Sequence, residues 1–150
     1  ASAATEDLLA AVHALEALGE TNLLATISGM LADALVNEKR YTEAEHFARR
    51  AKEFSDSGDV DAQVRWRRAL ARVLARRAET EEAEGLARHA LELVADTDCL
   101  NDHAHTLLDL AEVLRLAGRL EEATSAVAQA VALFERKENA AMAAQARRLL

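Results

Sequence analysis

The sequence repeats itself at intervals of 39 and 40 residues, and this repeat restricts the fold more than any other feature. Three columns mark the first half of each unit: Leu31, Leu70 and Leu110; Ala32, Ala71 and Ala111; Leu35, Leu74 and Leu114. Two alanine columns mark the second half: Ala44, Ala83 and Ala123; Ala51, Ala90 and Ala130. A unit of this length cannot bury its apolar face alone, so neighbouring units must stack on one another.

Each unit contains two segments in which apolar residues recur at i, i+4 and i+7, the spacing of a helix with one buried face. Polar stretches separate them, and the pattern predicts helices over 4–18, 21–37, 42–55, 60–77, 80–95, 101–117, 120–136 and 139–150. The alanine columns predict close contact between paired helices, because a larger side chain there would overpack the interface. Thr42, Thr80, Glu121 and Glu122 are expected to satisfy free N–H groups where the second helices begin.

Composition and charge exclude several classes of protein. The chain is 51% hydrophobic but only 3% aromatic, and it has no proline, which fits an all-helical protein and not a β-sandwich or barrel. A net charge of −8 predicts no nucleic-acid or membrane partner. The single cysteine, Cys99, excludes an internal disulfide, and no apolar run is long enough to cross a membrane. We therefore expect a cytoplasmic location, and the start at Ala1 suggests a piece of a larger protein.

The leucine and alanine columns resemble the tetratricopeptide repeat (TPR) family, and the best local match is Gly118 followed by the residues RLEEA. The resemblance covers residues 21–136 and implies an all-α, right-handed α-solenoid. Its repeats would span 21–58, 59–98 and 99–136, with capping helices at 1–20 and 137–150. Lys39 and Ala78 replace the usual turn glycine, and the period exceeds the family's usual length of about 34 residues. The resemblance implies a non-catalytic module that binds a protein or peptide in its concave groove without a cofactor.

A narrower resemblance concerns the segments 63–77, 107–123 and 133–150. They are similar to the C-terminal TPR region of large actinobacterial multidomain signalling proteins, which join a nucleotide-cyclase or regulatory domain and a P-loop ATPase domain to a repeat tail. This resemblance implies that the chain is such a tail and that its partners include other domains of the parent chain. The cyclase and ATPase chemistry would then lie outside these residues, and the sequence contains no P-loop motif.

The strongest candidate for a binding site is a row of arginines in the fourth expected helix. The row has 3-4-4 spacing, so its members share one helix face: Arg65, Arg68, Arg72 and Arg76. Arginine binds carboxylates with a planar fork, which favours an acidic peptide or a C-terminal carboxylate as the partner. We expect Arg65, Arg68 and Arg76 to contact it, with Trp66 beside them as an aromatic platform or as a packing residue.

A second interpretation of the same row is an internal ladder of ion pairs. Asp33, Arg72 and Glu112 occupy equivalent positions in the three units, so Arg72 could join two carboxylates of neighbouring helices. Arg68 could meet Asp109 in the same way. The two interpretations can hold for different arginines of the row. The carboxylate clamp of chaperone-binding TPR proteins is not matched, because Gly29 and Asp33 stand at its first positions.

Two further readings remain open. A group of potential metal ligands is found near the start of the sixth expected helix: Asp98, Cys99, Asp102, His103, His105 and Asp109. The favoured interpretation of this segment is a capped helix start with Asn101 or Asp102 at the N-cap, so we expect no metal site and no catalytic residue.

Self-association through the apolar face of 140–150 is an alternative function, and a metal-dependent enzyme fragment is a less favoured one.

Overall fold

The computed structural model describes all 150 residues and contains eight α-helices and no strand. The helices are α1 (Ala3–Leu18), α2 (Asn22–Asn37), α3 (Tyr41–Phe54), α4 (Val60–Arg76), α5 (Thr80–Ala95), α6 (Leu100–Leu116), α7 (Leu120–Arg136) and α8 (Ala140–Arg147). All eight expected helices are present, and the largest difference is α8, which ends at Arg147 instead of residue 150. None of them combines the length and apolar character that crossing a bilayer requires.

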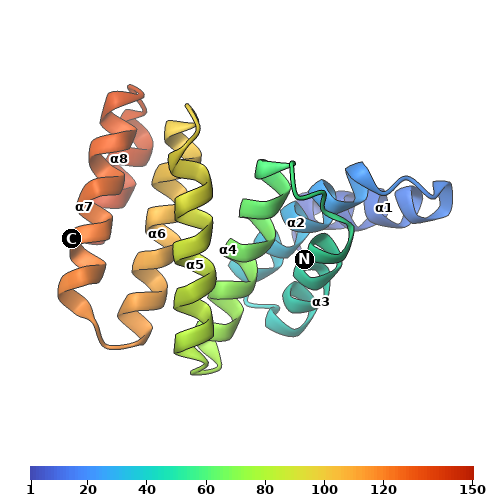
Figure 1. Ribbon diagram of the computed structural model, residues 1–150, viewed down its shortest axis with the longest axis horizontal. Coiled ribbons are helices and arrows are strands. Elements are labelled where there is room, and N and C mark those ends of the chain that lie inside the picture. Colours follow the sequence, from blue (N-terminus) through green and yellow to red (C-terminus); the bar gives the residue numbers. More distant parts are fainter.

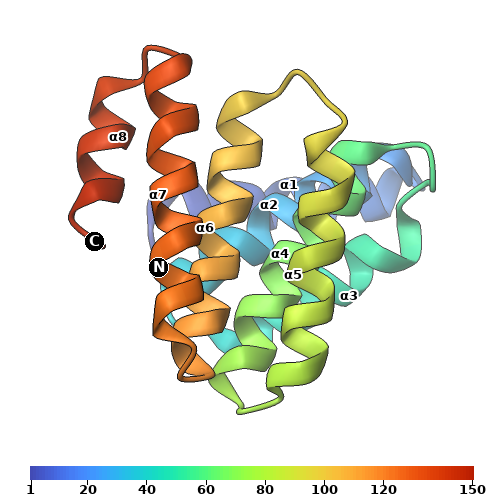
Figure 2. The same cartoon turned by 60° about the vertical axis from the view of Figure 1, so that its left-hand side comes forward.

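Successive helices pack against one another as antiparallel neighbours, which confirms the predicted α-solenoid of helix pairs. In Figure 1 the axes of the later helices are roughly aligned, whereas α1 runs across the opposite end of the molecule. Figure 2 shows α5, α6, α7 and α8 following one another side by side. The helix α4 is central, because it packs against α2, α3, α5 and α6. A segment in the middle of the sequence therefore joins the first unit, α2 and α3, to the start of the third unit, α6.

The leucine and alanine columns form the core of the solenoid. Every member of the five columns is at most 3% exposed. The small side chains let the helices approach closely, and α2 and α4 are in especially tight contact at Gly29. A Cβ atom at Gly29 would lie only 3.1 Å from the Cβ of Arg65, so this position accepts glycine much more readily than a larger residue. Close contact between α2 and α4 matters for the groove described below.

A common turn ends the first helix of each unit. The N–H groups of Arg40, Glu79 and Arg119 donate to the carbonyls of Leu35, Leu74 and Leu114, at 2.9 to 3.0 Å. This Schellman turn requires a left-handed residue one position earlier, and Gly118 supplies it with φ of 82°. In the other two turns, Lys39 and Ala78 adopt φ of 61° and 63°. The missing glycines noted in the sequence are therefore replaced by residues held in a strained conformation.

The expected polar side-chain caps of α3, α5 and α6 are wrong, whereas Glu121 and Glu122 lie in the first turn of α7 as expected. The N-cap residues of α3, α5 and α7 are Arg40, Glu79 and Arg119, and none of them caps its helix through its side chain. The N-cap of α6 is Cys99, so Asn101 and Asp102 lie inside the first turn. Arg40 and Arg119 instead bind the carboxylate three residues ahead, Glu43 and Glu122, through two hydrogen bonds each. At the starts of α3 and α7, an arginine–glutamate pair is therefore found where no side chain caps the helix.

In addition to the apolar contact through Val12, one carboxylate ties the start of α1 to the end of α2. Glu38 Oε1 accepts hydrogen bonds from the Thr5 hydroxyl at 2.6 Å and from the Ser2 backbone N–H at 2.9 Å. Arg40 pairs with the other oxygen of Glu38 at 3.2 Å. The hydrogen bonds from Thr5 and Ser2 lower the pKa of Glu38 from 4.5 to about 2, because they favour the ionised form. The start of α1 is thus tied to the α2–α3 turn.

Two substitutions at the left-handed position of these turns, alanine to glycine and glycine to alanine, should change the free energy of unfolding in opposite directions. Ala78→Gly should stabilise the protein by about 0.5–1 kcal/mol, because glycine removes the left-handed strain at a modest cost in chain entropy. Gly118→Ala should destabilise it by about 1 kcal/mol through the backbone alone, since a Cβ at Gly118 has no atom within 4 Å. Urea unfolding followed by circular dichroism measures both. Equal signs for the two variants would contradict this account of the turns.

Acid should loosen the start of α1. Because the pKa of Glu38 is lowered on folding, its contribution is complete above about pH 4.5 and is lost as the pH falls toward 2. Glu38→Gln should produce the same loosening at neutral pH. Amide hydrogen exchange should then accelerate in α1 and stay unchanged in α5, which serves as the internal reference. Uniform acceleration in both helices would show that Glu38 does not act locally.

Candidate binding site

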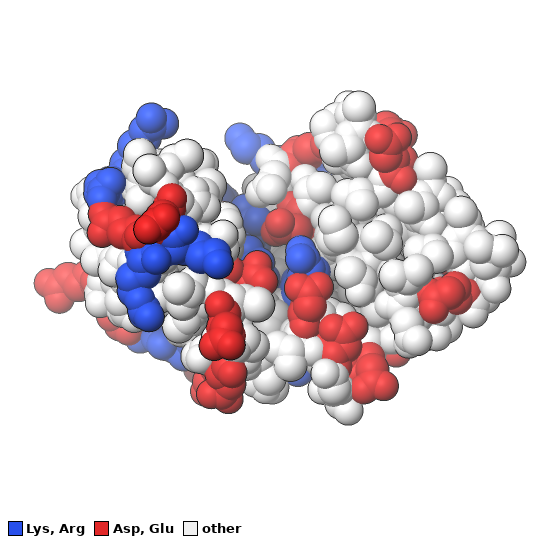
Figure 3. Space-filling model, turned by 90° about the horizontal axis from the view of Figure 1, so that it is seen from above, with Lys and Arg blue, Asp and Glu red and all other residues white.

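The first helices of the units, α2, α4 and α6, line a groove together with α8. The groove is a hollow of about 480 Å³ bordered by side chains from all four helices. Acidic and basic side chains meet where the surface is hollowed between the two halves of the molecule in Figure 3. Four arginines and three carboxylates line the hollow: Arg68, Arg72, Arg76 and Arg115; Asp33, Asp109 and Glu112. The groove therefore has an excess of positive charge in a chain whose net charge is −8.

Arg72 joins three successive first helices. Its Nη1 donates to Asp33 on α2 at 3.2 Å, and its Nε donates to Glu112 on α6 at 2.7 Å. Its Nη2 donates to Asn37 Oδ1 at 3.0 Å. The side chain is only 14% exposed. The structure thus brings Asp33, Arg72 and Glu112 into the contact that the ladder interpretation describes.

Arg68 and Asp109 form the most buried ion pair of the groove. Their Nε and Oδ2 atoms are 2.6 Å apart, and the side chains are 12% and 11% exposed. Burial works against the charged form of Arg68, but the attraction of Asp109 and Asp33 outweighs it and raises the pKa of Arg68. Burial raises the pKa of Asp109, and Arg68 and Arg72 oppose that shift. Arg68 is therefore committed to a carboxylate of its own chain.

Arg76 and Arg65 are more accessible. Arg76 Nη2 donates to Glu112 Oε1 at 2.6 Å, and its side chain remains 41% exposed. Burial acts to raise the pKa of Glu112, but the attraction of Arg72 and hydrogen bonds from Arg76 and Arg72 outweigh it, so the pKa is lowered. Arg65 pairs with Asp61 on its own helix at 2.8 Å and does not border the groove. Each arginine of the row thus has a carboxylate partner within the chain.

Trp66 lies in the core, not on the surface. It is 4% exposed, and its Nε1 donates to Gln63 Oε1 at 3.3 Å. The Arg67 guanidinium covers the indole ring at 4.2 Å from its centroid, and Lys52 approaches it at 5.3 Å. Trp66 is therefore packed and covered in this structure, and its ring presents no open face.

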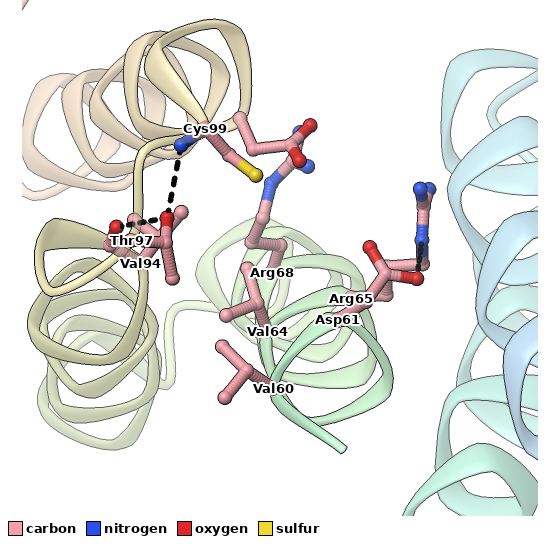
Figure 4. A pocket seen from close by; sticks show the side chains of 9 residues that line it. Val60, Asp61, Val64, Arg65, Arg68, Val94, Thr97 and Cys99 are labelled. Carbon is pink, nitrogen blue, oxygen red and sulfur yellow. Dashed lines mark hydrogen bonds and ion pairs between the residues drawn. The ribbon is translucent and has the colours of Figure 1, made fainter.

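A smaller cavity of about 120 Å³ lies between the start of α4, the end of α5 and the start of α6. Figure 4 shows Val60, Val64 and Val94 along its wall, with the side chains of Cys99 and Arg68 directed into it. Its lining is mostly apolar. The segment that supplies Cys99 is fixed by the Thr97 hydroxyl, which accepts from the Cys99 N–H at 3.2 Å.

The potential metal ligands near Cys99 do not come together. No three His, Cys, Asp or Glu side chains in the molecule are close enough to hold a metal ion. His105 packs edge to face against Phe134, with ring centroids 5.1 Å apart, and Asp109 is bound to Arg68. Burial and the nearby Arg68 lower the pKa of His105, so the neutral form is favoured. The potential ligands are thus neighbours in the sequence, but they do not form a set of metal ligands in the structure.

The sequence did not reveal the far end of the groove. Arg115, Met142 and Gln145 line it, although they belong to α6 and α8 and lie outside the arginine row. Their approach depends on how α8 packs beyond α7, and no repeat column predicts that arrangement.

A second set of ion pairs lies outside the groove, on the second helices. Arg88 on α5 pairs with Glu84 at 2.8 Å and approaches Glu122 on α7 at 3.4 Å. Arg119 also contacts Glu84. The Arg88 side chain is 44% exposed, close to the value for Arg76. Arg88 is therefore a matched reference for substitutions in the groove.

Removing the guanidinium of Arg72 should strongly destabilise the fold. Arg72→Met should cost about 2–4 kcal/mol, because partly buried carboxylates on two neighbouring helices lose their counter-ion. Arg88→Met should change stability by no more than about 0.5 kcal/mol, since its ion pairs are exposed. Urea unfolding of the two variants gives the comparison. Equal and small effects would show that the ladder does not hold the first helices together.

No protein-family model matches the chain, and no curated protein matches it in sequence. Among solved structures, the fold is similar to that in "Crystal structure of BtubC (BKLC) from P. vanneervenii", with a TM-score of 0.63 and 20% sequence identity. The match covers 88% of this chain and 56% of BtubC, so the chain spans little more than half of that protein's length. At this identity the likeness concerns the fold alone, and it supports a helical repeat-like architecture.

Proposed function

We propose that the protein is a non-catalytic scaffold that holds a segment of a partner protein in the groove formed by α2, α4, α6 and α8. The observation that carries this proposal is the groove itself, a hollow of about 480 Å³ lined by side chains from four helices. Helical repeats commonly use such a concave surface to bind extended partners.

The partner that fits this groove best is acidic. Its arginines outnumber its carboxylates, and Arg76 keeps a large part of its side chain accessible. Arg68 contributes mainly to the walls, since its side chain is 12% exposed. The resemblance to TPR proteins and to the repeat tails of actinobacterial signalling proteins supports the same role. In that setting the partner is another protein, or another domain of the parent chain, and the module works without a cofactor in the cytoplasm.

A second candidate is self-association, which the exposed leucines at the two ends of the solenoid favour. Leu18 and Leu23 are 78% and 56% exposed at one end, and Leu149 and Leu150 are 46% and 60% exposed at the other. Apolar side chains of this size at both ends could pair between copies. Sedimentation over a range of protein concentrations distinguishes this candidate from a monomeric scaffold.

Filling the groove without changing its charge tests the main proposal. Gln145 is exposed, lines the groove and lies on α8, whereas Gln129 is exposed, lies on α7 and faces away from it. Gln145→Trp should reduce capture of partner proteins from a host lysate by about tenfold or more, because a bulky ring at a binding surface costs several times RT. Gln129→Trp should leave capture unchanged. Quantitative mass spectrometry of the captured proteins provides the measurement.

The same experiment can contradict the proposal. Partners that both tryptophan variants retain, or that both lose, would place the interface outside the groove. Circular dichroism of each variant before the capture step verifies that the helices remain intact.

A further inference from the structure

Some hydrogen-bonding groups of the groove are already occupied within the chain, and others are free. Both carboxylate oxygens of Glu112 accept from arginines, one from Arg72 and one from Arg76. Asp109 accepts from Arg68 and has Arg72 near its other oxygen at 3.8 Å. The acceptors in the middle of the groove are thus occupied. A ligand that donates hydrogen bonds would have to displace an existing ion pair there.

Unused donors gather where α4, α6 and α8 meet. Arg76 donates only through Nη2, so its Nε and Nη1 remain available on a side chain that is 41% exposed. Arg115 on α6 is exposed, and its single contact is a long one, from Nη2 to the carbonyl of Leu149 at 3.4 Å. The exposed Gln145 borders the same hollow. This end of the groove can therefore accept an anion without breaking the ladder.

Apolar side chains lie next to these donors. Leu108 and Met142 are half-buried, and Leu149 is 46% exposed, and all three line the same hollow. An aliphatic side chain could bury itself among them. The combination of free guanidinium donors and an adjoining apolar surface distinguishes this end from the rest of the groove.

We infer that Arg76 and Arg115 form a subsite for the carboxylate side chain of an extended partner segment, with an adjacent aliphatic side chain on Leu108, Met142 and Leu149. This inference rests on the proposed function, since it describes one part of the same groove. It also changes which arginines are expected to contact the partner. Arg65 lies outside the hollow, and Arg68 is buried against Asp109. The planar fork of an arginine suits a carboxylate, and two forks from different helices would fix its position.

A defined peptide tests the subsite. The probe is a capped, fluorescently labelled peptide of alternating glutamate and leucine, and its binding is followed by fluorescence anisotropy. Arg115→Gln is the sharpest variant, because Arg115 takes no part in the ladder. It should weaken binding about fivefold, as expected for a solvent-accessible ion pair, and so should Arg76→Gln. Arg88→Gln, with a similarly exposed arginine outside the groove, should leave the affinity unchanged.

Two control peptides separate the contributions. Replacing the glutamates by glutamines should weaken binding to the wild type and abolish the difference between wild type and Arg115→Gln. Replacing the leucines by alanines should weaken binding equally for both proteins, because the apolar contact is independent of the arginine.

Three outcomes would overturn the inference. These are absence of saturable binding by the glutamate–leucine peptide, an equal loss in Arg88→Gln, and unchanged affinity in Arg115→Gln. If the Gln145→Trp capture experiment nevertheless succeeds, the groove remains the binding site and only the carboxylate subsite is wrong. If capture fails while the peptide behaves as expected, the subsite stands without the proposed partner function.

Discussion

Contact between helices over alanine side chains is the constraint on which the rest of the structure depends. The alanines of the repeat columns are at most 1% exposed, and at Gly29 even a methyl group would crowd the neighbouring helix. Because α2, α4 and α6 lie so close together, a single arginine on α4 can reach carboxylates on both neighbours. Larger residues in these columns would overpack the helix contacts. At Gly29, a displacement of α2 from α4 would carry Asp33 away from Arg72. Packing in the core thus determines the electrostatics of the groove.

Much of the fold could be predicted because its signals are local and repeated. The leucine columns fix which face of each helix is buried, and equal spacing places Asp33, Arg72 and Glu112 on the same face of neighbouring helices. A ladder between them needs only that the units stack in register. The helix ends were harder to predict. At Cys99 and Glu79 the helix begins without a side-chain cap, since packing of the whole unit stabilises a start that the local sequence does not.

The candidate site was only partly predictable. Helix periodicity shows that Arg65, Arg68, Arg72 and Arg76 lie together, but it does not show which of them a carboxylate of the chain occupies. That depends on distances such as the 2.6 Å between Arg68 and Asp109, which are set by stacking. Trp66 borders the row in the sequence and is nevertheless buried. Arg115 was overlooked because its place in the groove follows from the position of α8, which lies outside the repeat columns.

The central place of α4 has a consequence for how unfolding spreads through the molecule. In a solenoid held by apolar contacts between nearest neighbours, the ends can fray while the middle stays intact. Arg72 adds a connection across three units, because it binds α2 and α6 at the same time. Loss of structure at one end thus leaves a charge on α4 less well compensated, which weakens the attachment of the other end. Arg72 therefore couples the stability of α2 to that of α6, beyond the coupling that apolar contacts give to adjacent helices.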